Sequence, residues 1–247
     1  MTKIFLASID IHSKYLLPLF NRLNQLYFNL FSFYYLNSPK AKENYLKVTN
    51  KSINTLVDSG AHSFQKGTKV NYDKFLKEYI NFIEKTDNPK CLGYFELDVD
   101  NIIGYDKVLE YRQELEEVSN KIIPVWHKNR GIKDFKEMCR EYNYVSISGW
   151  KNEDIFDNQF KLFVNYAHHH HSKIHGLGLT RFKVLKSVPF DSVDSSSWTQ
   201  MLRFRNIDGK YISKEYANTQ KHSFEQLCYS KWMKIQREYA TPMELQS

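Results

Sequence analysis

Acidic residues and a histidine stand where several short apolar runs of this sequence end. Asp58, Asp98, His127 and Asp194 each close such a run. Short apolar runs bounded by turn residues indicate buried strands, and a barrel of parallel strands gathers its carboxyl ends at one face. We therefore expect these side chains to surround one mouth. Two carboxylates flanking a glycosidic bond are the chemistry that such a site supports most readily.

Other residues near these ends suit the binding of a flat ligand. Asp98 and Asp100 are two positions apart and would point to the same side of a strand, where they could bind a divalent metal or accept hydrogen bonds from the amidine edge of a guanine. Trp126 and His127 offer a stacking surface and a titratable donor. Small or flat residues follow other runs, namely Ser59, Gly60, Gly149, Trp150, Gly176 and Gly178. The alternatives are helix capping for the acids and core packing for the tryptophans.

The elements that must position these residues alternate between strand and helix. Strands are expected at 3–9, 52–57, 91–97, 121–126, 144–148, 173–178 and 190–193. Helices are expected at 13–36, 71–85, 105–118, 132–142, 152–169 and 180–186, with Asn71 or Asp73 capping the second. This alternation, with near-continuous apolar strands, predicts a parallel sheet covered on both faces. The fold class is α/β, a TIM-type (β/α)8 barrel with one strand unrecognised or missing; an open doubly wound sheet is the alternative.

The last fifty residues depart from this alternation. Residues 201–204 and 206–207 are expected to form a β-hairpin with 210–213 around the Asp208–Gly209 turn, and residues 223–239 a closing amphipathic helix. No internal repeat or long linker interrupts the chain, so residues 1–247 are expected to form a single domain.

Composition narrows the setting in which the protein works. The formal charge is +7, from 35 Lys and Arg against 28 Asp and Glu, which is compatible with a polyanionic partner. The three cysteines form no CxxC pair, which argues against a disulfide framework or a cysteine-rich zinc site and favours a reducing cytoplasm. Neither a signal peptide nor a membrane span is expected. The run His168–His171 is expected to be an exposed helix end rather than a metal site.

The ordered set of segments DSGAHSF, ELDVD, PVWH, SISGW, HGLGLT and FDSVDSSSW resembles the tRNA-guanine transglycosylase superfamily. The resemblance covers about residues 50–200 and is nearest to the DNA 7-deazaguanine transglycosylases of phages and bacteria. It implies a (β/α)8 barrel that exchanges guanine in a polynucleotide for a 7-deazaguanine such as preQ0. A carboxylate would attack C1′ to form a covalent glycosyl-enzyme, which the incoming base then displaces.

The resemblance also implies roles for individual residues. Asp194 matches the nucleophile; Asp191, which follows a Phe as the family nucleophile often does, is the competing choice. Asp58 matches the general acid/base, and Asp98 matches the acid that reads the guanine edge, with Asp100 beside it. The remaining base contacts would fall to Trp126 or His127 and to the backbone of Gly149.

The sequence departs from the tRNA-acting enzymes in one respect. Those enzymes carry a zinc site of three cysteines and a histidine after the nucleophile strand, whereas only Cys228 lies in that region here. We therefore expect no zinc subdomain and no cofactor, with DNA and a free 7-deazaguanine base as partners. Backbone contacts are assigned to Arg181, Lys183, Lys186, Arg203, Arg205 and Lys210. The alternatives are a tRNA-acting or other N-glycosidic enzyme, and a non-catalytic nucleic-acid-binding barrel.

Overall fold

The computed structural model describes residues 2–60, 63, 70–148 and 155–241, and its centre is a parallel sheet that closes into a barrel. The strands are β1 (Lys3–Leu6), β2 (Leu26–Ser32), β3 (Ser52–Asp58), β4 (Cys91–Phe95), β5 (Ile122–Ile123), β6 (Val125–Trp126), β7 (Tyr144–Ser148), β8 (Lys173–Leu177) and β9 (Ser192–Ser195). Their order is β5-β4-β3-β2-β1-β9-β8-β7-β6. Only Pro124, which has no N–H to donate, separates β5 from β6. The two are halves of one barrel strand, because β5 pairs with β4 and β6 with β7. The fold is therefore the expected TIM-type (β/α)8 barrel.

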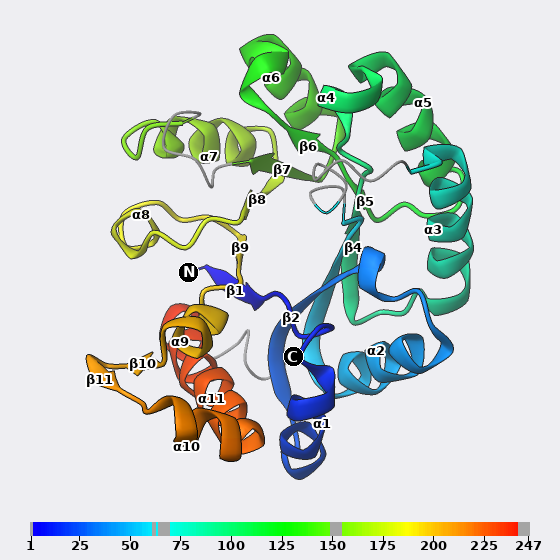
Figure 1. Cartoon of the computed structure of the whole chain (residues 1–247). Coiled ribbons are helices and arrows are strands. Elements are labelled where there is room, and N and C mark those ends of the chain that lie inside the picture. Colours follow the sequence, from blue (N-terminus) through cyan, green and yellow to red (C-terminus); the bar gives the residue numbers. More distant parts are fainter. Residues whose placement is uncertain (1, 61–62, 64–69, 149–154, 242–247) are drawn as a thin grey trace.

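Helices surround the strands (Figure 1). They are α1 (Ser13–Arg22), α2 (Pro39–Lys51), α3 (Tyr72–Thr86), α4 (Asp100–Ile103), α5 (Tyr105–Glu116), α6 (Gly131–Glu141), α7 (Phe160–His169), α8 (Phe182–Leu185), α9 (Trp198–Phe204), α10 (Lys214–Thr219) and α11 (Lys221–Tyr239). The Asn71 side chain accepts a hydrogen bond from the Lys74 amide and caps α3, as expected. The long helix α11 completes the ring by packing on α1, where the Phe20 and Tyr229 rings lie 5.0 Å apart.

The strand missing from the predicted set is β2. The prediction of one helix over residues 13–36 is wrong, because α1 ends at Arg22 and the chain then enters the sheet between β1 and β3. Leu26–Ser32 is apolar at nearly every position and buried on both faces, and such a run matches a helical period as well as an extended one. Asn29 fixes its place: its amide donates to Ser52 Oγ at 2.9 Å and its carbonyl accepts from the Tyr229 hydroxyl at 2.6 Å.

The predicted C-terminal hairpin is shorter than expected. Residues 201–204 are not a strand but the end of α9. The hairpin pairs β10 (Asn206–Ile207) with β11 (Lys210–Tyr211). Its turn is the predicted Asp208–Gly209, and both residues have positive φ, as a type I′ turn requires. Among the described residues, no helix combines the length and the apolar character needed to cross a membrane.

Candidate active site at the carboxyl ends of the strands

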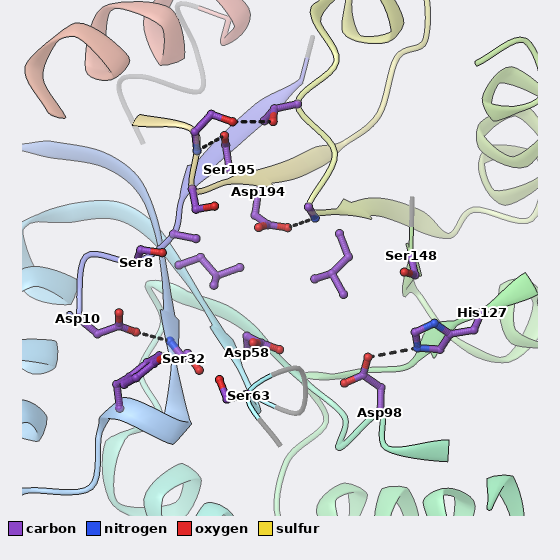
Figure 2. A pocket seen from close by; sticks show the side chains of 18 of the residues that line it. Ser8, Asp10, Ser32, Asp58, Ser63, Asp98, His127, Ser148, Asp194 and Ser195 are labelled. Atoms are coloured by element: carbon purple, nitrogen blue, oxygen red, sulfur yellow. Dashed lines mark hydrogen bonds and ion pairs between the residues drawn. The ribbon is translucent and has the colours of Figure 1, made fainter. Parts of the chain in front are cut away.

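A cavity of about 840 Å³, lined mostly by polar residues, opens where the carboxyl ends of the strands meet. Four carboxylates line it within the described part of the chain, those of Asp10, Asp58, Asp98 and Asp194. Figure 2 shows Asp58, Asp98 and Asp194 around the same space, with Asp10 to one side. The residues that sequence analysis placed at separate strand ends thus share one site.

Asp194 lies in β9 and is 8% exposed. Its Oδ1 accepts a hydrogen bond from the Gly178 amide at 2.6 Å and lies 3.2 Å from His175 Nε2. Gly178 reaches this position with φ of +64°, a conformation that favours glycine. Two fixed contacts on one oxygen orient the carboxylate.

Asp191 occupies the opposite end of the barrel. It precedes β9, and its Oδ2 accepts a hydrogen bond from the Ile174 amide at 2.8 Å, at the beginning of β8. The same oxygen lies 2.8 Å from His168 Nε2. Of the two carboxylates considered for nucleophilic attack, Asp194 is therefore the one that faces the cavity.

Asp58 is the last residue of β3. Burial raises its pKa well above the usual range, and the negative charges of Asp98 and Asp194 raise it further, while a hydrogen bond with the Gly60 backbone opposes this. A carboxyl group in these surroundings keeps its proton to higher pH and can act as an acid. Gly60 lies at the turn with φ of +87°, where a Cβ would be 2.4 Å from Tyr34 Cβ. Ser59 is buried and does not line the cavity.

Asp98 and His127 form a pair on the cavity wall. His127 Nε2 lies 3.2 Å from Asp98 Oδ2. Burial raises the pKa of Asp98, against the hydrogen bond with His127. Burial lowers the pKa of His127, but the hydrogen bond and charge of Asp98 outweigh it and the net shift is upward. The imidazole therefore orients the carboxylate and compensates its charge.

Asp100 does not share the cavity face with Asp98, contrary to the prediction from their spacing. Strand β4 ends at Phe95, so the alternation of side chains does not extend to these positions. Asp100 instead begins α4 and accepts a hydrogen bond from Arg130 Nε at 3.1 Å. Burial raises the pKa of Asp100, but the charges of Arg130 and His127 and the hydrogen bonds from Arg130 and Asn129 together outweigh it, and the net shift is downward. Its contacts are those of a structural ion pair.

Trp126 and Gly176 also lie away from the cavity. Trp126 is 3% exposed, packs on Phe135 and donates from Nε1 to the Gly131 carbonyl at 2.8 Å. At Gly176 a Cβ would lie 2.9 Å from Leu179 Cδ2, so this glycine permits close packing rather than ligand contact. Trp198 is fully buried in the core as well. Gly149 and Trp150 lie outside the described residues.

The basic residues assigned to nucleic-acid contact are distributed unevenly. Arg181 lines the cavity, with its Nε 3.1 Å from Asp157 Oδ1. The others lie outside the lining, in or directly after α8 and α9 and in the hairpin: Lys183, Lys186, Arg203 and Lys210 are exposed, and Arg205 is half-buried against the Tyr211 hydroxyl. Of these six residues, Arg181 is thus the one positioned to contact a group inside the cavity.

Asp10 is the cavity carboxylate that sequence analysis did not assign to the site. It follows β1, and its oxygens accept hydrogen bonds from the Ser32 and Ile11 amides at 2.7 and 2.8 Å. Burial raises its pKa. The sequence pattern that predicts a site residue also holds for Asp10, because Asp10 follows the first apolar run just as Asp58 follows the second. The neighbouring Ser8 also lines the cavity and has a positive φ of 64°.

In the described ranges, no group of three or more His, Cys, Asp and Glu side chains is arranged to hold a metal ion. No protein-family model matches the sequence, and no curated protein matches it. Among solved structures, the chain is similar to a GH10 endoxylanase retrieved from a sugarcane soil metagenome. The TM-score is 0.48 at 10% sequence identity, covering 78% of this chain and 84% of the endoxylanase. The fold class follows from the strand order and closure of the barrel itself.

Proposed function

We propose that this protein is a transglycosylase that exchanges guanine in DNA for a 7-deazaguanine base through a covalent intermediate on Asp194. The observation that carries this proposal is the convergence of Asp58, Asp98 and Asp194 on one cavity, with Asp194 held by two contacts on a single oxygen. Three acids in different surroundings supply a nucleophile, a proton donor and a hydrogen-bond acceptor for a base.

In the first step, the free oxygen of Asp194 attacks C1′ of the target nucleotide. The bond between C1′ and the base nitrogen breaks, and its electron pair remains on the base. Asp58, whose raised pKa favours the protonated form, gives its proton to the departing guanine. The products are a glycosyl ester on Asp194, a neutral guanine and an ionised Asp58.

In the second step, the incoming 7-deazaguanine takes the place of guanine. Its ring N–H loses a proton to Asp58, and the nitrogen attacks C1′ and releases Asp194. Two displacements on the same carbon retain the sugar configuration. Asp58 thus donates a proton in one direction and accepts one in the other, as microscopic reversibility requires.

Asp98 is the acceptor for the base. A guanine edge presents adjacent N–H donors, and a carboxylate accepts two such bonds side by side. His127 holds Asp98 at 3.2 Å and favours its ionised form. A 7-deazaguanine has the same edge, so the same residue can hold the leaving and the entering base.

The choice of DNA over tRNA rests on the resemblance and on the cysteines. Cys91, Cys139 and Cys228 are buried and far apart in the sequence, which does not suit the zinc site of the tRNA-acting enzymes. Exchange of a base in a duplex would require the nucleotide to flip into the cavity.

The test measures incorporation of labelled preQ0 into guanine-containing DNA, together with trapping and mapping of the covalent adduct. Asp194→Asn is expected to abolish both. Asp191→Asn is the matched control, because it changes an acid three positions away at the opposite end of the barrel, and it should retain both. An adduct mapped to another residue would overturn the mechanism. Exchange into tRNA without exchange into DNA would overturn the choice of polymer, and release of free guanine without exchange would indicate a glycosylase.

A further inference from the structure

His175 is a polar side chain that packs against phenylalanine rings inside the barrel. It is fully buried, and its ring lies 4.9 Å from that of Phe95 and 6.4 Å from that of Phe5. Burying an imidazole among phenylalanines is costly unless both nitrogens have hydrogen-bond partners. An apolar residue would fill this position at lower cost, so the contacts of His175 indicate what it does.

Both nitrogens belong to one chain of hydrogen bonds. His175 Nε2 lies 3.2 Å from Asp194 Oδ1, and His175 Nδ1 lies 2.5 Å from Ser192 Oγ. Ser192 Oγ in turn lies 2.5 Å from the Tyr144 hydroxyl. Strand pairing sets this arrangement, because His175 in β8 is in register with Ser192 in β9. The chain runs through the barrel interior and ends at the proposed nucleophile.

The positions of the protons in this chain of hydrogen bonds follow from Asp194, at one end of it. An ionised Asp194 only accepts hydrogen bonds, so His175 Nε2 must carry the proton that it donates. In a neutral imidazole Nδ1 then accepts, and Ser192 must donate to it. Ser192 Oγ in turn accepts from the hydroxyl of Tyr144, whose pKa is raised by burial, so the phenol stays protonated. Every group is satisfied in this one direction.

We propose that Tyr144, Ser192 and His175 form a positioning relay for Asp194. The relay holds His175 as the neutral tautomer with a proton on Nε2, and His175 together with the Gly178 amide fixes Oδ1 of Asp194. The other oxygen, Oδ2, is then the one directed at C1′. The attack itself rests on the proposed function, whereas the tautomer does not. His175 acts through Asp194 and touches no substrate.

The tautomer can be measured without substrate, by NMR of protein labelled with ¹⁵N-histidine, with His175→Gln used to assign the signal. His175 is expected to show a proton on Nε2 and none on Nδ1. In Ser192→Ala the Nδ1 resonance should shift, because that nitrogen loses its donor. A proton on Nδ1, or a doubly protonated ring, in the unmodified protein overturns the relay.

The kinetic test measures the rate of adduct formation on Asp194 at saturating DNA, alongside DNA affinity. His175→Leu and Ser192→Ala are expected to slow the adduct by up to about 100-fold, the scale of a misplaced reacting group, with unchanged affinity. His175→Gln, which keeps an N–H donor, should recover part of the rate. Ser146→Ala is the matched control: Ser146 is also buried beside His175, but its hydroxyl donates to the His175 carbonyl rather than to the ring. It should react at the unmodified rate.

These outcomes separate the relay from the proposed function. If the unmodified protein forms no adduct, the function fails, and the NMR result still decides the tautomer. If the unmodified protein reacts and both Ser192→Ala and His175→Leu, folded by circular dichroism, react equally fast, the relay is overturned. The relay is likewise overturned if these variants lose DNA affinity in proportion to rate, because that result indicates general damage to the cavity.

Discussion

Glu96 is a fully buried carboxylate that holds two arginines beside the site. Its Oε2 accepts from Arg112 Nε at 2.6 Å, and its Oε1 accepts from the Val125 amide at 2.7 Å and from Arg130 Nη1 at 3.3 Å. Both guanidinium groups are themselves buried. Replacing Glu96 by Gln keeps the size of the side chain and removes its charge. The positive charges of Arg112 and Arg130 then lose their shared partner in a place that water does not reach.

The expected cost follows from the contacts that remain. Removing one member of a buried ion pair costs about 3–5 kcal/mol. Arg130 keeps Asp100 at 3.1 Å from its Nε, whereas Arg112 loses the carboxylate that accepted from its own Nε. We therefore expect the lower end of that range, about 3 kcal/mol. Urea denaturation monitored by circular dichroism measures the change in the free energy of unfolding.

Glu43→Gln supplies the matched control. Glu43 also pairs with two cations, Lys40 at 3.0 Å and Lys47 at 2.6 Å, but it lies on the exposed face of α2. Solvent screens those pairs, so its loss should change stability little. If both variants lose the same free energy, or neither loses any, then burial does not decide the strength of these ion pairs and the reasoning is refuted.

Three further predictions concern the cavity acids and the turn at Gly60. Asp98→Asn and Asp10→Asn each remove a negative charge that raises the pKa of Asp58. Since the general acid must be protonated, the loss of adduct formation at high pH should move to lower pH in both variants, and further in Asp98→Asn. An unchanged pH profile contradicts the assignment of Asp58 as the general acid. Asp58→Asn should stabilise the protein at neutral pH. The pKa of Asp58 is higher in the folded than in the unfolded protein, so its contribution to stability is complete below the unfolded pKa and is lost as the pH rises towards the folded pKa. The gain in melting temperature over the unmodified protein should therefore be larger at pH 7.5 than at pH 4. Gly60→Ala should lower the free energy of unfolding by about 2–5 kcal/mol, with about 1–2 from its positive φ and about 1–3 from overpacking against Tyr34. Gly104→Ala has the same φ of +87° but open space around it, so it should show only the cost of the positive φ in the same urea titration.

Much of the barrel could be predicted because most of its strands are short apolar runs that can be recognised from the local sequence. Residues 144–148 were predicted as a strand, and β7 has those bounds. The strand predicted at 121–126 is present as β5 and β6, interrupted at Pro124. The failure at β2 has a physical reason, since a run apolar at nearly every position lacks the alternation that distinguishes strand from helix. Tertiary contacts place this segment in the sheet: β2 lies between β1 and β3, and Asn29 bonds to Ser52 and Tyr229.

The site residues that sequence predicts correctly are likewise those that lie at or near the ends of strands. Asp58 and Asp194 lie at or near the ends of well-defined strands, and both line the cavity. Asp98 and Asp100 lie beyond the end of β4, where the loop sends the first to the cavity and the second to Arg130. The role of His175 depended on the register of β8 with β9, which no local pattern encodes. Sequence thus predicts which acids stand near strand ends, while tertiary contacts determine their directions.

The surroundings of the cavity acids also determine which of them takes the proton. Asp98 has His127 and Arg130 nearby, and both lower its pKa against the effect of burial. Asp58 has no comparable cation among its main influences; its neighbours Asp98, Asp194 and Asp10 all raise its pKa. When acids share a cavity, a proton goes to the one whose negative charge is least compensated. In the proposed mechanism, these surroundings favour Asp58 as the proton carrier, Asp98 as the acceptor for the base and Asp194 as the nucleophile. Exchanging the proposed roles of Asp58 and Asp98 would require removing the compensation that His127, and to a smaller extent Arg130, gives to Asp98. Glu96 and Asp100 hold Arg130 in place.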